Sequence, residues 1–184
     1  MVYPIVVYGS PILRKIAKEI DKDYPKLTEI ISDMFETMTV SDGVGLAAPQ
    51  IGKSIRLIVI DASELADEDE SLEGFKKVFI NPKIVAETGD NWPFTEGCLS
   101  LPNIREEINR LGTIRIQYYD ENFNFTDETH DGIKARIIQH EYDHLQGILL
   151  IDHVSPLRRK LLKSKLNDIA KGKSDAKYKT KVLK

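Results

Sequence analysis

Two segments near the N-terminus carry apolar residues at helical spacing. Ser10 and Pro11 are typical of an N-cap and a first helical position, and apolar residues then recur every three or four positions as far as Ile20. A second amphipathic segment begins after Pro25. Its apolar stripe comprises Leu27, Ile30, Ile31, Met34, Phe35 and Met38. Both segments are therefore predicted to be helices that bury one face in the core.

The middle of the chain has the residue pattern of a sheet. Residues 55–61, 78–85 and 113–119 are rich in β-branched and aromatic side chains, which favour strands. Between the first two lies the segment 64–73, which is dense in Asp and Glu. Because its acids have no ordered ligand spacing, we interpret it as a solvated surface loop rather than a metal site.

Two more helices are predicted in the last third of the chain. One runs from about Ile133 to Gln146 and closes at Gly147, a typical residue just past a helix C-terminus. The other begins at Ser155-Pro156 and continues to about residue 170. One side of it is apolar, formed by Leu157, Leu161, Leu162, Leu166 and Ile169.

The order of these elements predicts a single α+β domain. A mainly antiparallel sheet packs around the helix at 133–146, with helices on the N-terminal side and one C-terminal helix. A chain of 184 residues fits one domain and can bury roughly 70% of the surface that its unfolded form exposes. Neither a repeat nor a linker divides it. We expect the folded domain to cover residues 1–170 and residues 171–184 to form a basic, flexible tail.

Composition and charge narrow the class of protein. The chain is 41% hydrophobic and 30% charged, as in soluble globular proteins. No signal peptide or membrane-spanning apolar run is visible, so we expect a cytoplasmic protein without membrane or DNA partners. Residues 155–184 hold 11 Lys or Arg and two acids, a net charge of +9, against −12 for the rest. This end either contacts an anionic partner such as ribosomal RNA or is a solvated helix face with a frayed terminus.

The helix at 133–146 carries candidate chemistry. His140 and His144 are four residues apart, so their imidazoles lie on one face and can grip one ion. Glu141 projects beside them, where a carboxylate can reach a metal-bound water without being a ligand. Given this composition, the motif would arise by chance only roughly 0.006 times. We therefore predict a catalytic divalent-metal site.

A third ligand is needed, because catalytic sites use three protein ligands and leave one position for water, whereas structural zinc sites fill all four. The downstream histidine of many metalloproteases is absent, since Leu150 occupies its position and His153 comes too late. Upstream, Cys98 is the only cysteine and follows a glycine. It is either the third ligand or a buried structural cysteine. Two imidazoles with one thiolate suit Fe(II) or Zn(II) better than Mg(II) or Ca(II).

Three ordered motifs resemble those of peptide deformylase. They are residues 43–50 (GVGLAAPQ), 96–100 (EGCLS) and 139–147 (QHEYDHLQG), and the likeness extends over roughly residues 4–155. The resemblance implies a hydrolase that removes the formyl group from the N-terminal formylmethionine of nascent polypeptides and releases formate. Nascent formylated peptides would then be its partners, with contact to the ribosome through the basic tail as a further expectation.

The resemblance also implies roles for individual residues. Cys98, His140 and His144 would hold the metal, which in this family is typically Fe(II) and is replaceable by Ni(II), Co(II) or Zn(II). Glu141 would act as general base on the metal-bound water and then as general acid toward the leaving amine. The carboxamide of one further residue and a backbone N–H would stabilise the oxyanion. These two donors are Gln50 and Leu99.

The segment 43–50 is open to two interpretations. On its own it is typical of a tight turn before a strand, whereas the resemblance implies that Gly43, Val44, Gly45 and Leu46 bind the substrate as an added strand. The side chains of Val44 and Leu46 either line a methionine pocket or pack in the core. The rival functions are an ordinary zinc metallopeptidase, disfavoured by the missing downstream ligand, and a non-enzymatic metal-binding protein, which would not need Glu141.

Two hypotheses concern the surroundings of the ligands. Glu96 and Arg110 are predicted to form an ion pair that fixes the turn carrying Cys98. Asp143 faces away from the ligands on an ideal helix, so it is either a solvated charge or a support for the ligand residues.

Overall fold

The computed structural model describes all 184 residues and confirms a single α+β domain. Its main sheet is antiparallel, with the strands in sequence order. They are β2 (Gly45–Ala47), β3 (Leu57–Asp61), β4 (Lys76–Gly97), β5 (Arg105–Tyr119) and β6 (Phe125–Asp131). The helices are α1 (Leu27–Val40), α2 (Gly132–Leu145), α3 (Pro156–Leu161) and α4 (Lys163–Ala170). Among the helices, none combines the length and the apolar character that crossing a membrane would require.

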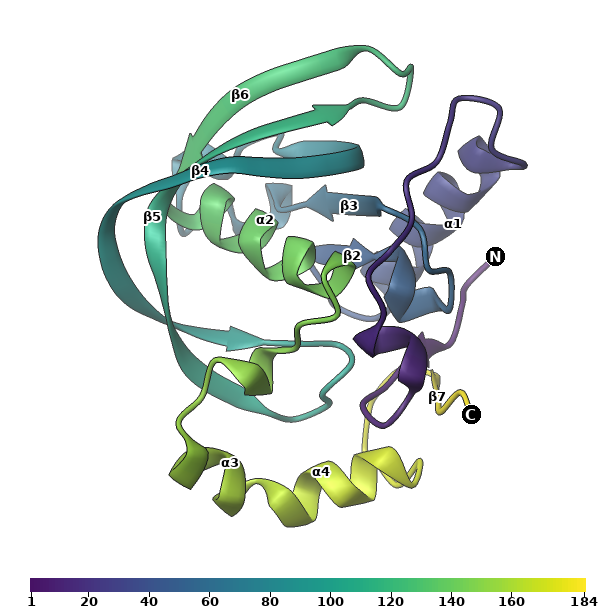
Figure 1. Cartoon of the computed structure of the whole chain (residues 1–184), viewed down its shortest axis with the longest axis vertical. Helices are drawn as coiled ribbons and strands as arrows, with labels where there is room; N and C mark the ends of the chain where they lie inside the picture. Colours follow the sequence, from purple (N-terminus) through teal and green to yellow (C-terminus); the bar gives the residue numbers. More distant parts are fainter.

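Helix α2 lies within the curve of the sheet (Figure 1) and contacts β2, β3, β5 and β6. Its buried side chains, among them Ala135 and Ile138, join a core cluster with Phe79, Ile114 and Ile116. The predicted helix at 133–146 is confirmed within one residue at each end. Because the sheet holds it along its length, the ligand positions on α2 have a rigid support.

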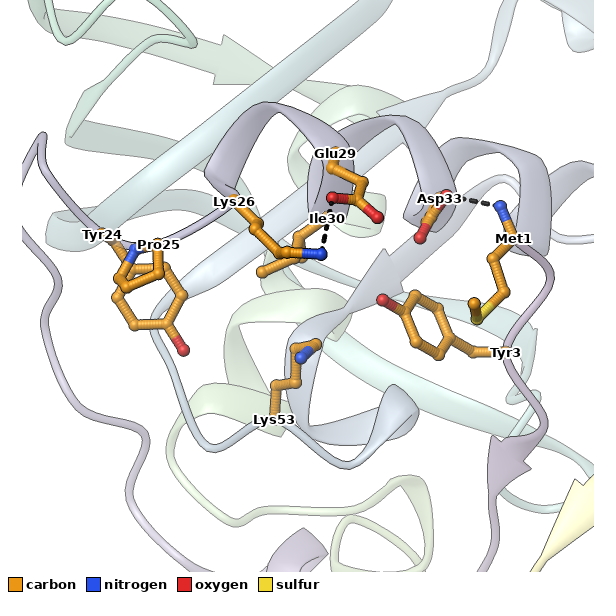
Figure 2. A pocket seen from close by; sticks show the side chains of 9 residues that line it. All are labelled: Met1, Tyr3, Tyr24, Pro25, Lys26, Glu29, Ile30, Asp33 and Lys53. Atoms are coloured by element: carbon orange, nitrogen blue, oxygen red, sulfur yellow. Dashed lines mark hydrogen bonds and ion pairs between the residues drawn. The ribbon is translucent and has the colours of Figure 1, made fainter.

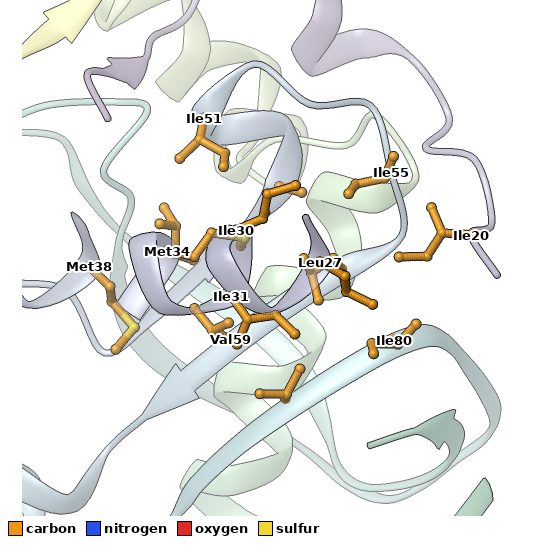
Figure 3. Packing of buried hydrophobic residues seen from close by; sticks show 14 of the residues in the cluster. Ile20, Leu27, Ile30, Ile31, Met34, Met38, Ile51, Ile55, Val59 and Ile80 are labelled. Carbon is orange, nitrogen blue, oxygen red and sulfur yellow. The ribbon is translucent and has the colours of Figure 1, made fainter. Parts of the chain in front are cut away.

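Helix α1 packs against β2 and β3 and forms a second core cluster (Figure 3). The predicted stripe faces that core: Leu27, Ile30, Ile31, Met34 and Met38 are all buried. They pack against apolar residues of β2 and β3 and of the segment between these two strands. Leu46 is one of these residues and is fully buried. The amphipathic pattern therefore predicted α1 correctly.

The predicted helix at 10–20 is wrong. Only Pro11–Arg14 forms a short 3-10 helix, and Lys15 is already in an extended conformation. The backbone after it forms hydrogen bonds with other segments instead of within a helix. The N–H of Ala17 donates to the carbonyl of Leu145, and Lys18 forms a β-bridge with Ile55. Ile16 is 69% exposed, so the apolar spacing there does not mark a buried helix face.

The predicted single C-terminal helix is divided into α3 and α4 at Leu162. Leu166 and Ile169 are buried, but Leu157 and Leu161 are 71% and 67% exposed. The first turns of this segment run along the outside of the molecule, away from the main sheet (Figure 1). Of the apolar side predicted from the sequence, the part on α4 packs in the core and the part on α3 is exposed to solvent.

The last residues also differ from the expected flexible tail. Thr180–Lys181 forms β7, which pairs in parallel with β1 (Ile5–Val6) in a second, two-stranded sheet. In Figure 1 this segment lies beside the N-terminal part of the chain. Backbone hydrogen bonds to β1 order residues whose lysine-rich composition alone gives no reason to expect a strand.

The predicted strand at 55–61 is confirmed as β3, which begins two residues later, whereas two other strands extend well beyond their predicted bounds. The prediction missed their outer parts because the residues there are mostly polar. The predicted strand at 78–85 is the first half of β4, and that at 113–119 is the second half of β5. The remaining halves form an arm whose side chains are largely exposed. Strand β6 has the sequence FTDETHD and buries only His130, so it lacks the apolar signal on which strand prediction depends. The acidic segment 64–73 is a surface loop with two 3-10 turns.

Candidate metal centre

The three predicted ligands come together. Ligand atoms of Cys98, His140 and His144 lie within 4.8 Å of one another. His140 and His144 are supplied by consecutive turns of α2, whereas Cys98 follows the end of β4. The sequence separates Cys98 from the histidines by more than 40 positions, and the long β4–β5 arm closes that gap by bringing its end back to α2.

The arrangement fits a divalent metal. The Sγ atom of Cys98 is 3.3 Å from Nε2 of His144. Two such ligands on one tetrahedral ion would be separated by about 3.5 Å, given ordinary metal–sulfur and metal–nitrogen distances. The pKa of Cys98 supports a thiolate: burial opposes its ionisation, but the charge of His144 and a hydrogen bond with His140 lower the pKa to about 5. A thiolate and two imidazoles form a ligand set for a transition metal.

Glu96 orients His140. Its Oε2 atom is 2.9 Å from Nδ1 of His140, so that nitrogen is engaged and Nε2 remains for a metal. The Oε1 atom of Glu96 accepts a hydrogen bond of 2.7 Å from Nε of Arg110, which confirms the predicted ion pair. Burial favours the neutral acid, but hydrogen bonds from His140 and Arg110 hold the pKa of Glu96 far below its usual range.

Asp143 belongs to the same network. Its Oδ2 atom accepts a hydrogen bond of 2.8 Å from Nη1 of Arg110, so the hypothesis of a supporting role agrees with this contact. His153 approaches the same oxygen at 2.8 Å. Arg110 thus bridges one carboxylate on the β4–β5 arm and one on α2. This bridge ties together the two elements that supply the ligands.

Glu141 is buried beside the ligands, and its Oε2 atom has no hydrogen-bond partner. Burial raises its pKa, and the charges of His140 and His144 only partly offset the shift. Gly45 explains how the carboxylate fits, because a Cβ atom at that position would lie 2.6 Å from Oε1 of Glu141. The carboxylate is therefore held against the backbone of β2, and its buried Oε2 atom is left without a compensating hydrogen bond.

Gln50 is buried and directed toward Cys98. Its Oε1 atom accepts the N–H of Ala47 at 2.8 Å, which fixes the orientation of the amide. Its Nε2 atom then lies 3.9 Å from Sγ of Cys98 and 3.3 Å from Oγ of Ser100. The resemblance implied Gln50 as a donor at the site, and its amide N–H group does face Cys98.

Strand β2 offers a free edge beside the ligands. It is the first strand of the sheet and pairs only with β3. The carbonyl of Val44 accepts the N–H of Asp61, so by antiparallel alternation the N–H and C=O of Gly45 point to the unpaired side. The fully buried side chain of Leu46 belongs to the α1 core and does not line a methionine pocket. Gly43 packs against Leu99, whose Cδ1 atom would be 2.9 Å from an added Cβ.

A surface hollow of about 480 Å³ lies beside the start of α1 (Figure 2). It is lined by residues such as Tyr3, Tyr24 and Lys53, together with acidic side chains of α1. None of the candidate ligands, and neither Glu141 nor Gln50, contributes to it. Its size is therefore no argument for a reaction there, since the reactive groups converge elsewhere.

Comparison with known proteins agrees with this geometry. A family model described as polypeptide deformylase matches residues 2–160. The chain belongs to the polypeptide deformylase family. Among curated peptide deformylases, that of Christiangramia forsetii is 52% identical over 186 residues, covering 97% of this chain and 95% of the relative. That of Flavobacterium psychrophilum is 48% identical over 190 residues, covering 100% and 98%.

Solved structures of the family have the same fold. The peptide deformylase from Thermotoga maritima is 40% identical with a TM-score of 0.76, covering 85% of this chain and 99% of that one. The enzyme from Legionella pneumophila is 37% identical with a TM-score of 0.80, covering 93% and 96%. Family membership makes this chain a hydrolase of the peptide deformylase type, which removes N-formyl groups from nascent peptides.

Sequence reasoning missed Arg136, which belongs to the hydrogen-bond network around Glu96. Its Nη1 atom donates to Oε1 of Glu96 at 3.0 Å, and its Nη2 atom donates to the carbonyl of Trp92 at 2.7 Å. The guanidinium also stacks over the Trp92 ring, 4.5 Å from its centre. Arg136 lies four residues before His140, one helical turn away, and this spacing is the one signal that could have identified it.

Proposed function

We propose that this chain hydrolyses the formamide of N-terminal formylmethionine on nascent polypeptides, with Glu141 as the proton-transfer residue. The observation that carries the proposal is the buried carboxylate of Glu141 beside Cys98, His140 and His144, with an oxygen that has no partner. A purely structural metal site has no use for an uncompensated acid at that position, because burying it costs free energy. The nascent chains on which it acts belong to the cytoplasm.

Cys98, His140 and His144 would hold one divalent ion, with Fe(II) as the physiological metal and Zn(II), Ni(II) or Co(II) as substitutes. When bound, the ion would supply Lewis acidity toward the formyl oxygen and the attacking water. The ligand types support this choice, because one thiolate and two imidazoles prefer such metals over Mg(II) or Ca(II). Glu96 fixes His140 through its Nδ1 atom and so presents the other ring nitrogen.

Glu141 carries the proton through the reaction. As water attacks the formyl carbon, the carboxylate of Glu141 accepts one proton, and it then donates that proton to the nitrogen as the C–N bond breaks. Formate and a free N-terminal amine result. The raised pKa of Glu141 favours both steps. A carboxylate whose pKa lies closer to the working pH is a stronger base toward water and, once protonated, can still act as an acid toward the amine nitrogen.

Two donors complete the site. The Nε2 group of Gln50 and the backbone N–H of Leu99 are proposed to stabilise the oxyanion, an interaction whose removal typically costs about 10² to 10³ in rate. The free edge of β2 at Gly45 is proposed to bind the substrate backbone as an added strand, with Gly43 and Val44 beside it. Leu46 supports this edge from within the core.

Release of formate from a formyl-Met-Ala peptide tests the proposal. Anaerobically prepared, iron-loaded protein is expected to release one formate and one free amine per peptide. The acetyl-Met-Ala peptide, which has the same backbone and side chains, serves as the matched substrate and should react far more slowly because its extra methyl group crowds the reacting carbon. Folded, metal-loaded protein that releases no formate would refute the proposed function.

The basic C-terminal part is proposed to contact the ribosome. The exposed Leu157 and Leu161 lie on α3 next to Arg158, Arg159 and Lys160, so this surface is both apolar and cationic. Residues 155–184 carry the net charge of +9, which suits ribosomal RNA. A contact at this surface would bring the enzyme to the chains that it processes.

Charge removal on the tail should weaken co-sedimentation with bacterial ribosomes. We expect Lys171→Gln combined with Lys177→Gln to reduce the bound fraction and its salt dependence, because fewer counterions are released on binding. The same two changes at Lys15 and Lys22, which are also exposed but lie near the N-terminus, are the matched control and should bind as wild type does. Equal binding by both double variants would contradict the proposed contact.

A further inference from the structure

The end of the chain lies along β1 in an ordered arrangement. The N–H of Ile5 donates to the carbonyl of Lys179 at 2.8 Å, and the N–H of Val7 donates to that of Lys181 at 3.0 Å. The family model ends at residue 160, so this segment lies outside the part of the chain that it matches. We call residues 175–183 the strap.

The other edge of β1 holds the loop after β4, which carries Cys98. The N–H of Tyr8 donates to the carbonyl of Ser100 at 2.9 Å, and Oγ of Ser100 donates to the carbonyl of Val6 at 2.8 Å. Alternate residues of an extended chain direct their backbone groups to opposite sides. The N-terminal strand is therefore held between the strap on one edge and the Cys98 loop on the other.

The strap also reaches the loop directly. The hydroxyl of Tyr178 donates a hydrogen bond of 2.8 Å to the carbonyl of Leu99, the residue after Cys98. The Tyr178 ring is half-buried and packs against the α1 core cluster, as does the Leu99 side chain. A second contact lies further along the loop, where Nδ2 of Asn103 donates to the carbonyl of Asp175 at 3.4 Å.

We propose that the strap is part of the catalytic apparatus and that Tyr178 is a positioning residue for the backbone of Leu99. This inference rests on the proposed function, in which the Leu99 N–H donates to the oxyanion. The N–H and the carbonyl of Leu99 belong to two successive planar peptide groups joined at its Cα atom, so only the φ and ψ dihedrals of Leu99 separate their directions. By fixing the carbonyl, the Tyr178 hydroxyl restrains the direction in which the N–H points.

The surroundings explain why the loop needs this bond. The next backbone carbonyl and hydroxyl, those of Ser100, are already held by β1, and the N–H of Leu101 donates to the carbonyl of Cys98 at 2.9 Å. The Leu99 carbonyl has Tyr178 as its side-chain partner. Without the hydroxyl, the peptide group of the Leu99 carbonyl loses its side-chain restraint, and the N–H on the other side of the Leu99 Cα atom is held less firmly. A donor that is no longer preorganised stabilises developing charge less well.

Tyr178→Phe removes the hydroxyl and retains the ring, so it tests the bond without disturbing the packing. We expect kcat for formyl-Met-Ala to fall roughly three- to tenfold, as for loss of one neutral hydrogen bond, and KM to change by less than about twofold. The matched control is Tyr24→Phe: Tyr24 packs against the same core cluster, but its hydroxyl makes no hydrogen bond. This control should keep wild-type kcat.

Hydrogen exchange at the Leu101 amide provides a measurement that does not depend on activity. The Leu101 N–H donates a hydrogen bond to the carbonyl of Cys98, within the same loop. Its exchange rate should therefore rise in Tyr178→Phe and stay unchanged in Tyr24→Phe. Equal kcat in the two variants, or a lower kcat with unchanged Leu101 exchange, would overturn the positioning role. If wild-type protein releases no formate, the proposed function fails, and the exchange comparison still decides whether the strap restrains the loop.

Discussion

Glu141→Gln is expected to lower kcat/KM for formyl-peptide hydrolysis by roughly 10² to 10⁴, the usual contribution of a positioned acid–base group. The amide has the shape of the carboxylate, so it fits the space that Gly45 leaves beside β2. It cannot accept and return a proton at neutral pH. Metal content should remain that of wild type, because Glu141 is not one of the three clustered ligands.

The measurement is single-turnover formate release, with the metal content of each sample determined in parallel. Glu107→Gln is the matched control, since Glu107 is exposed on β5 and belongs to no part of the site. Its rate should equal that of wild type. Full activity of metal-loaded Glu141→Gln would show that proton transfer follows another route, and loss of metal from this variant would contradict the assignment of Glu141 as a non-ligand.

The parts of the site that were predicted are those encoded by local spacing or by a motif. His140, Glu141 and His144 share one helix, so 3.6-residue periodicity alone places them together. Cys98 was a candidate as the only cysteine, but the resemblance was needed to prefer the ligand over a buried structural role, and Gln50 came from the resemblance alone. Spacing says nothing about residues that come together through long-range folding. Arg136 has no such motif. A cation four residues before a histidine is a common surface pattern, and only tertiary packing buries it against Glu96.

The fold shows the same division. Helix α1 was predictable because its apolar stripe faces a core along its whole length. The wrong helix at 10–20 has similar spacing, but backbone bonds to Leu145 and to the loop before β3 keep this segment extended. Strand β6 and the strap gave no apolar signal, since each is ordered mainly by backbone pairing with a partner distant in sequence. Apolar periodicity reports a continuous buried face, and neither of these segments has one.

Arg110 links the two elements that supply the ligands, so its removal should affect stability and metal retention together. Its side chain is 7% exposed and bonds both Glu96 and Asp143, which are themselves 5% and 16% exposed. Arg110→Leu would leave the carboxylates of Glu96 and Asp143 in place but without the cation that pairs with both of them. Breaking a buried ion pair in this way typically costs about 3 to 5 kcal/mol in the free energy of unfolding.

The same change should weaken metal binding. Without Arg110, Arg136 is the only arginine that still holds the Glu96 carboxylate. The carboxylate then orients His140 less firmly, and the turn that carries Cys98 is less well fixed. We expect roughly 10- to 100-fold weaker metal affinity, the usual cost of losing a partner that orients a ligand. Competition with a chelator measures this affinity, and thermal unfolding of the metal-free protein measures the stability separately.

Arg115→Leu supplies the matched control. Arg115 lies on the same strand, and its guanidinium makes two hydrogen bonds of 2.8 Å to Asp127, but its side chain is 57% exposed. An ion pair in water contributes little, because solvent compensates for its loss. Both arginines form an ion pair with a carboxylate. They differ in that the Arg110 pair is buried and its partner Glu96 also bonds His140. Unchanged metal content and activity in Arg110→Leu would refute the supporting role of this network, and equal losses in both variants would refute its dependence on burial.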